Sequence, residues 1–483
     1  MIPTREDGLL ELVRERVRGI AGNPATPPDL LVRMLDHRPA GLAVLIFRGA
    51  LPDEVCRAVA AHPDRQLRLT LADCGSATGE QRALLVDDPE PTIRTSLAAG
   101  PDLFRGTPDP LPEAAYARLA ADPVRRVREA LADSRQCPEQ VRARLADDPD
   151  PVVRSTAYAR WADPPEEVTD RLLADPDEGV RRVVARHACR RRPGLLPGVL
   201  DTTWSDGWHL AAVAVDAPLD RASAERLARH EDPMVRAAVA ENPHLPPDLV
   251  DALAVDPEPK VRLRLSVRPG LTEAERGAID YRVRPTDRIS PARWVLAHLD
   301  DPEALDEAVR SAHVGLRRSA AYSRHLRPDQ VARLAADEDF AVRLLLCENH
   351  DAVPGEVLLA TYLQARVITA GMLIQRPNFP RVGLARLADS ADPRARRLVR
   401  YDPDAPAELI DRLSRDPDDG VRAWTAADPR LGPDRVAELL DDPATAGAAA
   451  GNRKLPIEMI EGILAEAGVP GAGVTVTPST GEG

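Results

Sequence analysis

Histidine and cysteine are the residues of this 483-residue chain best suited to metal binding or nucleophilic chemistry, but neither is spaced for it. Cysteine-based metal sites use closely spaced pairs, whereas no two of the five cysteines lie closer than 18 residues. The His230–Glu231 pair and the His187–Cys189 pair are isolated, and the sequence carries no phosphate-binding loop, zinc-protease motif or serine-hydrolase elbow. We therefore predict no catalytic residue, no metal and no cofactor, and a protein that is not an enzyme.

Aromatic and arginine side chains near residues 209, 289 and 370 are the candidates for binding a partner. Exposed Trp and Arg side chains are typical anchors of protein interfaces. Alternatively, these residues repack a core that has drifted from a regular pattern, since Arg near a helix C-terminus is favourable in any case. The candidates for partner binding are Arg190, Arg191, Arg192, Trp204, Trp208, His209, Arg288, Arg293 and Trp294.

These stretches interrupt a phrase that recurs about every 26 residues: Asp-Pro, three variable positions, Val and Arg. It reads DPVRRVR at 122–128, DPDPVVR at 148–154, DPDEGVR at 175–181, DPEPKVR at 256–262 and DPDDGVR at 416–422. A period of this length is typical of a solenoid, in which each unit packs on its neighbours. We predict an all-α solenoid of about 16 two-helix repeats, with irregular units near 209, 289 and 370 and a decayed last unit near 448 (DDPATAGAA).

Residues 245–269 show how one unit is built. Pro246 and Pro247 favour the first turn of a helix, in which Leu249, Val250 and Leu253 form one apolar stripe. A second helix follows the Asp-Pro step and carries Val261 and Leu265 toward the core. Both helices have about 8 to 10 residues, so they depend on stacking for stability.

The Asp-Pro step suggests a cap at the start of the second helix, because Asp is a preferred N-cap and Pro is favoured directly after it. Ser replaces this Asp in two units, and Ser caps equally well, so we expect a capping role rather than a catalytic one. His is the exception in two further units. The residues at this position are Asp88, Asp122, Asp148, Asp175, Asp256, Asp337, Asp416, Asp442, Ser311, Ser390, His62 and His230.

The arginine of the phrase is the most regular charged feature of the sequence. In a stack its side chains would form a ladder and meet the aspartates or carbonyl groups of adjacent units, which favours a structural role over a ladder that binds a ligand. The clearest members of this ladder are Arg94, Arg128, Arg154, Arg181, Arg236, Arg262, Arg343 and Arg422.

This phrase resembles the leucine-rich repeat variant family, most closely over residues 242–262 (NPHLPPDLVDALAVDPEPKVR). The resemblance spans about residues 20–455. It implies a right-handed superhelix of alternating α- and 3₁₀-helices without strands, similar in style to HEAT and armadillo solenoids. One founding member of the family joins its repeats to a Cys-rich iron–sulfur segment; this chain lacks the Cys cluster, so that cofactor is not expected.

Composition narrows the choice of partner and location. The formal net charge of −13 argues against non-specific nucleic-acid binding, which phosphate contacts drive. We predict a scaffold that binds another protein; the alternative is a HEAT-like nucleic-acid binder that uses local Arg and aromatic patches. Scattered cysteines and the lack of a signal sequence or a long apolar run favour the cytoplasm and no membrane. We expect one solenoid domain over residues 1–466 and a flexible tail over 467–483.

Overall fold

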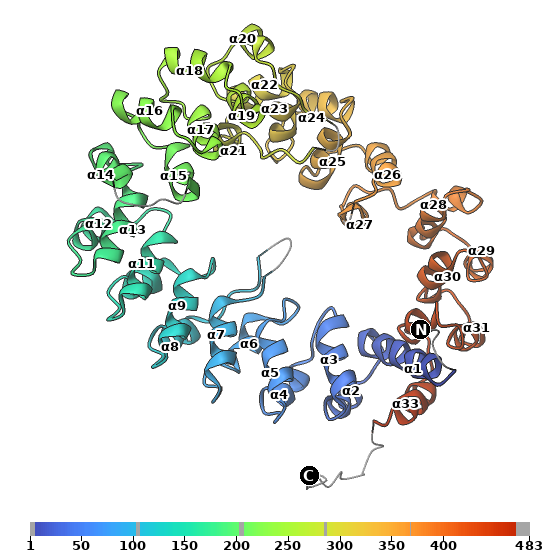
Figure 1. Ribbon diagram of the computed structural model, residues 1–483. Helices are drawn as coiled ribbons and strands as arrows, with labels where there is room; N and C mark the ends of the chain where they lie inside the picture. Colours follow the sequence, from blue (N-terminus) through green and yellow to red (C-terminus); the bar gives the residue numbers. More distant parts are fainter. Residues whose placement is uncertain (1–4, 103–106, 202–206, 285–286, 368, 470–483) are drawn as a thin grey trace. The chain divides into compact units, whose positions relative to one another are not determined.

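The computed structural model describes residues 5–102, 107–201, 207–284, 287–367 and 369–469, and their regular structure is entirely helical (Figure 1). No strand occurs within these ranges. Trp204 and residues 470–483 of the predicted tail lie outside the described residues. The all-α prediction is therefore confirmed for the part of the chain that the structure describes.

The helices come in pairs, as the repeat predicts. We call the first helix of each repeat its first-type helix and the second its second-type helix. In the repeat at residues 245–269, the first helix is α18 (Pro247–Ala254), with Pro246 as its N-cap, and the second is α19 (Pro259–Ser266). Val261 and Leu265 are completely buried, which confirms the apolar pair of the second helix.

The chain divides into two compact units, one made of residues 1–164 and 381–483 and the other of residues 165–380. The first unit begins with α1 (Arg5–Gly22). Its first-type helices are α2 (Pro28–Leu35), α4 (Asp53–Ala60), α6 (Gly79–Ala83), α8 (Glu113–Ala120), α10 (Glu139–Leu145), η2 (Leu384–Leu387), α29 (Ala407–Leu413), α31 (Pro433–Leu439) and α33 (Ile457–Glu466). Its second-type helices are α3 (Arg38–Phe47), α5 (Arg65–Ala72), α7 (Pro91–Ala99), α9 (Arg125–Asp133), α11 (Pro151–Ala159), α28 (Pro393–Arg397) with η3 (Leu398–Tyr401), α30 (Asp419–Ala426) and α32 (Ala446–Ala450).

The second unit has the same alternation. Its first-type helices are α12 (Glu166–Leu173), η1 (Pro193–Leu195) with α14 (Leu196–Asp201), α16 (Arg221–Ala228), α18, α20 (Glu273–Ala278), α22 (Pro302–Arg310), α24 (Pro328–Ala335) and α26 (Gly355–Gln364). Its second-type helices are α13 (Glu178–Ala188), α15 (Gly207–Ala214), α17 (Pro233–Ala240), α19, α21 (Arg293–Ala297), α23 (Val314–Ala320), α25 (Phe340–Asn349) and α27 (Ala370–Leu373).

Second-type helices pack on the second-type helices of neighbouring repeats, for example α15 on α17 and α17 on α19. First-type helices pack on the second-type helix of their own repeat, as α18 does on α19. The core of the second unit is continuous across these layers, from Val213 through Val239 and Leu253 to Ile279. Each repeat is thus stabilised by its neighbours, as in other solenoids.

The alternation of α- and 3₁₀-helices that the family resemblance implies does not describe this chain. Both helices of a repeat are α-helical: Val250 N donates to Pro246 O at 3.1 Å at the start of α18. Among the described residues, 3₁₀-helices occur only at η1, η2 and η3. The physical reason is length, since 3₁₀ geometry is tolerated mainly in runs of three or four residues and most helices here are longer.

The predicted capping role of the Asp-Pro aspartate is wrong. The N-cap of α19 is Glu258, two residues after Asp256, because a turn through Pro257 separates the aspartate from the helix. Oδ1 of Asp256 accepts a hydrogen bond at 2.9 Å from the backbone N of Glu258 and so closes this turn. Every residue at this position accepts the same bond from the residue two further on, including Ser311, Ser390, His62 and His230.

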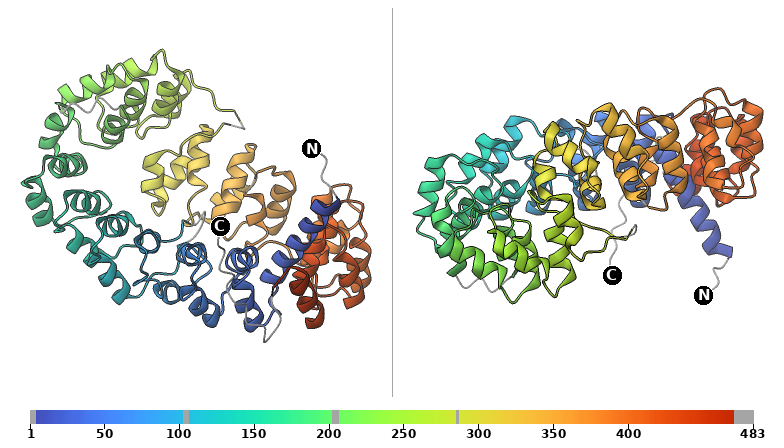
Figure 2. Two further views of the ribbon diagram at one scale, coloured as in Figure 1. Left: turned by 60° about the horizontal axis from the view of Figure 1, so that its bottom comes forward. Right: turned by 90° about the horizontal axis from the view of Figure 1, so that it is seen from above.

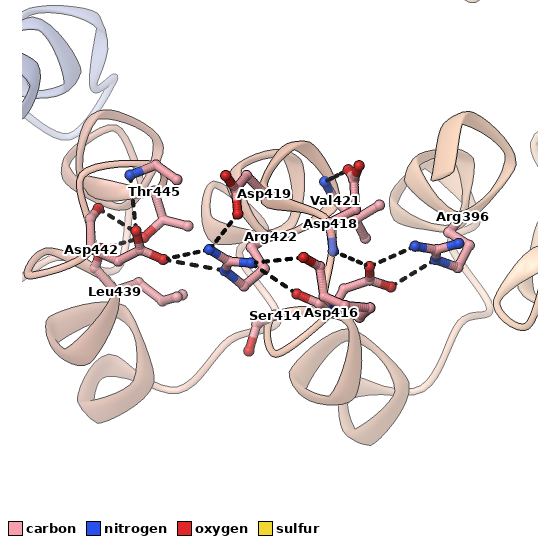
Figure 3. A network of polar contacts seen from close by, with 12 residues as sticks. Arg396, Ser414, Asp416, Asp418, Asp419, Val421, Arg422, Leu439, Asp442 and Thr445 are labelled. Carbon is pink, nitrogen blue, oxygen red and sulfur yellow. Dashed lines mark hydrogen bonds and ion pairs between the residues drawn. The ribbon is translucent and has the colours of Figure 1, made fainter. Parts of the chain in front are cut away.

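The aspartate has a second partner, the phrase arginine of the preceding repeat. Nε of Arg236 lies 2.8 Å from Oδ2 of Asp256 and its Nη2 lies 3.1 Å from Oδ1. Nη1 of the same arginine donates to the carbonyl oxygen of His230 in its own turn at 2.8 Å. We call this arrangement a rung. Figure 3 shows two consecutive rungs, Arg396 to Asp416 and Arg422 to Asp442.

Rungs of this kind join other neighbouring repeats, with Arg–Asp distances of 2.6 to 2.7 Å for Arg68–Asp88, Arg94–Asp122, Arg128–Asp148 and Arg317–Asp337. Arg154 and Arg181 donate to the carbonyl oxygens of Asp148 and Asp175 in their own turns. The rung changes where an irregular unit follows: Arg262 reaches the backbone oxygen of Asp280 at 2.7 Å, and Arg343 reaches Oε1 of Gln364 at 3.0 Å.

Substitutions at Asp256 separate its two contacts. Asp256→Ala removes the turn acceptor and leaves Arg236 without its carboxylate, so we expect a loss of about 2 kcal/mol in stability. Asp256→Ser keeps an acceptor for Glu258 N, as Ser311 does naturally, so it should be intermediate. The exposed Asp251 of α18 provides the matched control, Asp251→Ala. Thermal unfolding followed by circular dichroism should give the highest midpoint for the parent, an intermediate midpoint for the Ser variant and the lowest for the Ala variant. A Ser variant as stable as the parent would contradict the rung.

Candidate protein-binding surface

Two of the predicted Arg patches meet in the second unit at Asp216, which follows α15. Nε of Arg190 lies 2.8 Å from Oδ1 of Asp216, and Nη1 of Arg293 lies 3.9 Å from Oδ2. Nη2 of Arg190 also donates to the carbonyl oxygen of Ala212 at 2.9 Å. The patches near residues 190 and 293 therefore share one carboxylate, which offsets part of their positive charge.

The other arginines of the first patch lie elsewhere. Arg192 contacts first-type helix α12 through an ion pair with Glu166 and a 2.6 Å hydrogen bond to Oδ1 of Asp170. Arg191 is exposed. The structure therefore does not gather the three consecutive arginines on one surface.

The two described tryptophans among the candidates differ in environment. Trp208 is 63% exposed, and its ring packs edge-on against His209 with the ring centroids 5.1 Å apart. Trp294 is half-buried, and its indole N–H donates to the carbonyl oxygen of Val267 at 2.7 Å. Trp208 is thus available as a surface anchor, whereas Trp294 holds α21 against the end of α19.

A groove lies on the second-type helices α17 and α19 of this unit, beside the irregular segment 287–290. It has a volume of about 730 Å³, within the size range of sites that hold small ligands or side chains. Its apolar lining is Pro233, Met234, Ala237, Leu263, Val267 and Ile289, and its charged lining is Asp232, Glu258, Lys260, Arg264, Asp287 and Arg288. Arg288 is the predicted candidate that lines this groove; the others do not.

Some of the charged side chains that line the groove have hydrogen-bond partners, and others do not. Asp232 caps α17 by accepting from Met234 N at 2.8 Å, and Asp287 accepts from Arg284 N at 2.8 Å. Lys260 and Arg288 are exposed, and neither forms an ion pair with a residue that the structure describes. The groove therefore offers two unpaired cations beside an apolar floor.

Arg264 connects the floor of the groove to its wall. Its Nη1 donates to the carbonyl oxygen of Ser290 at 3.1 Å, which fixes the irregular segment. Its Nε lies 2.5 Å from Oε1 of Glu241 at the C-terminal end of α17, although the pair lacks hydrogen-bond geometry. Burial raises the pKa of Glu241 to about 7, and the nearby charges of Arg264 and Arg293 act against this rise.

Sequence reasoning missed Lys260, Glu241 and Arg264. Lys260 is one of only two lysines in the chain, and this was the only signal that could have singled it out. Glu241 and Arg264 stand at ordinary positions of regular repeats. Within the part of the chain that the structure describes, no three His, Cys, Asp or Glu side chains gather as a metal site.

The geometry defines a helical-repeat protein whose second-type helices present a groove. Comparison with known families agrees, since residues 233–258 match the leucine rich repeat variant family. This segment runs from the start of α17 through α18 to the N-cap of α19, so the match covers the length of one helix pair. No curated protein gives a significant match to the chain. None of the described helices is both long enough and apolar enough to cross a bilayer.

The raised pKa of Glu241 predicts a pH-dependent cost. Its pKa is near 4.5 in the unfolded chain and about 7 in the fold, so the unfolded chain loses this proton first and stability falls as pH rises through this window. Above about pH 7 the cost reaches its full value, roughly 3 kcal/mol from the difference of 2.5 between the two pKa values.

Comparing Glu241→Gln with the parent isolates this cost, because His313, with a pKa lowered by burial to about 4, acts in the opposite direction in both proteins. We expect the unfolding midpoint of the variant, relative to the parent, to rise between pH 5 and pH 8. The exposed Glu231→Gln is the control and should show no such rise. A constant offset across this range would mean that Glu241 is ionised throughout.

Proposed function

We propose that this chain is a non-enzymatic repeat scaffold whose groove on α17 and α19 binds a short segment of a partner protein. The observation that carries the proposal is the pairing of an apolar floor with two unpaired cations. Met234 is 43% exposed there, and a flexible Met side chain is well suited to contact a varied apolar partner.

The chemistry of the groove selects the kind of segment. An apolar side chain of the partner would pack against Met234, Ala237 and Leu263, while a neighbouring carboxylate would reach Lys260 or Arg288. Trp208 and Arg190 lie in the same unit and supply further anchors of the type common at interfaces. A partner segment that carries apolar and acidic residues fits this surface best.

A cytoplasmic location accompanies the proposal, because all five cysteines are free and buried, as suits a reducing compartment. A right-handed superhelix of about 16 repeats also stays a prediction, supported by the matched family segment and the helix pairing.

Nucleic acid is the weaker candidate. It requires a surface on which unpaired arginines converge. Arg190 and Arg293 do converge, but on Asp216, and the groove itself contains three acidic side chains. These carboxylates would repel phosphate groups, so they favour a protein partner.

Photo-crosslinking in the intact chain tests the proposal. A benzophenone side chain at Met234 should capture a protein partner from the native cytoplasm, whereas the same group at Val255, which is 80% exposed outside the groove, should not. Crosslinking of the same proteins from both positions would contradict binding in the groove.

Charge reversal then tests the recognition chemistry with the captured partner in purified form. Lys260→Glu combined with Arg288→Glu should weaken its affinity at least tenfold, because both cations would become repulsive. Lys454→Glu and Arg282→Glu, at exposed positions outside the groove, are matched controls and should have little effect. Binding that survives the double reversal, or tight binding of an oligonucleotide at physiological salt, would overturn the proposal.

A further inference from the structure

The two ends of the described chain pack against each other within the first unit. Helix α1 lies on α32 and α33, and it also packs on α3. Figure 1 and the left view of Figure 2 show the blue N-terminal helix beside the red C-terminal helices. This packing is independent of the groove on α17 and α19.

Asn23, directly after α1, joins the ends in the register of consecutive repeats. Its Nδ2 donates to the carbonyl oxygens of Ala450 and Asn452, both at 2.9 Å. Asn452 makes the equivalent pair of bonds to Ala426 and Asp428 in its own preceding repeat, at 2.9 and 2.8 Å. Asn23 therefore occupies the next position in the same series.

Asn242 shows that this pattern belongs to the ordinary repeat. Its Nδ2 donates to the carbonyl oxygens of Ala214 and Ala217 at 2.7 and 2.8 Å, at the end of the preceding second-type helix. Here donor and acceptors are fewer than 30 residues apart, whereas Asn23 makes the bonds across more than 420 residues of sequence. By this criterion α1 is a second-type helix stacked on α32.

The crossing of α1 and α32 requires small residues. A Cβ placed on Gly19 would lie 2.0 Å from the carbonyl oxygen of Gly447 and 2.7 Å from Cβ of Ala450. Ile20, next to this contact, is completely buried. The run AGAAA of α32 is thus a surface shaped for close approach of α1, and the last unit is not simply decayed.

Arg16 ties α1 to the remaining C-terminal helices. Its Nε donates to the carbonyl oxygen of Leu440 at 3.0 Å, and its Nη2 lies 2.7 Å from Oδ1 of Asp441, directly after α31. Its Nη1 lies 3.4 Å from Oε2 of Glu466 at the end of α33. One arginine side chain, 13% exposed, thus contacts both first-type helices that flank the crossing.

We infer that α33 and α1 form one composite repeat, with its first helix from the C-terminal end and its second helix from the N-terminal end. Helix α33 begins after Pro456, as first-type helices α18 and α29 begin after Pro246 and Pro406, but no second-type helix follows it among the described residues. Helix α1 complements it, since it precedes the first helix pair. The composite repeat is a clasp that makes residues 1–164 and 381–469 one cooperative unit, and it forms only after the C-terminal repeats have been synthesised.

Hydrogen exchange on the intact chain tests the clasp. Gly19→Ala places a methyl group against the backbone of Gly447, so we expect at least tenfold faster exchange in α32 and α33, with α17 and α19 unchanged. Gly462→Ala on α33 is the matched control, because a Cβ there meets no atom within 4 Å. Exchange in α32 equal to that of the parent would overturn the inference.

Two hydrogen-bond variants provide a second test if Gly19→Ala does not fold. Asn23→Ala and Asn242→Ala each remove the equivalent three bonds, two donated to the preceding repeat and one accepted from the residue two further on. The first should speed exchange in α1 and α32, and the second in α15 and α17. A response of the whole chain to Asn23→Ala would contradict a local clasp. Protection of α32 that depends on protein concentration would show that α1 comes from a second copy and would also overturn the inference.

Discussion

The rung between consecutive repeats is the interaction on which this structure depends. Second-type helices such as α17 and α19 have only eight residues each, too few to be stable alone. One carboxylate, such as Asp256, both closes the turn into its own helix and receives the guanidinium of the preceding repeat. Local folding and the register of stacking are thus set by the same side chain.

The geometry explains why burying these charges is tolerated. The side chains of Arg396 and Asp416 are 13% and 6% exposed, and the carboxylate receives two guanidinium bonds and one backbone bond. The arginine hydrogen bond holds the pKa of Asp416 below its usual range, against the effect of burial. A buried ion pair is favourable only when its remaining hydrogen-bonding capacity is met, and the rung meets it.

The repeated phrase made the helix pairs and their core positions predictable from the sequence. The geometry of the turns between the helices could not be predicted in this way. The apolar spacing of Val261 and Leu265 identified the core side of the second helix, and Pro246 marked the start of the first. The sequence predicts a cap at Asp256, because it does not show that a turn separates this residue from the helix. Arg236 binds the same carboxylate through two nitrogens only because neighbouring repeats stack in one register. The repeat period indicates that the repeats stack, but it does not give this register.

The candidate site was less predictable, since it depends on contacts between distant segments. The sequence singled out Arg190, Arg288 and Arg293 as candidates. It did not show that Arg190 and Arg293 would share the carboxylate of Asp216, which offsets part of their charge. It suggested Trp294 as an anchor, whereas the indole is used to hold α21. Trp204 lies outside the described residues, so its role stays a prediction.

The groove and the altered rung have one cause, which is the loss of a regular second-type helix after α20. Residues 287–292 have no helical structure, and the second-type helix that follows them, α21, has only five residues. It is held to the end of α19 by the hydrogen bond from Trp294 to Val267. Arg262 then has no aspartate of the usual kind and bonds to the backbone of Asp280 instead. The surface of α19 that a regular helix would cover, including Lys260 and Leu263, lines the groove. The groove thus forms where regular stacking is reduced, and Arg264, held between Glu241 and Ser290, restores part of the lost support.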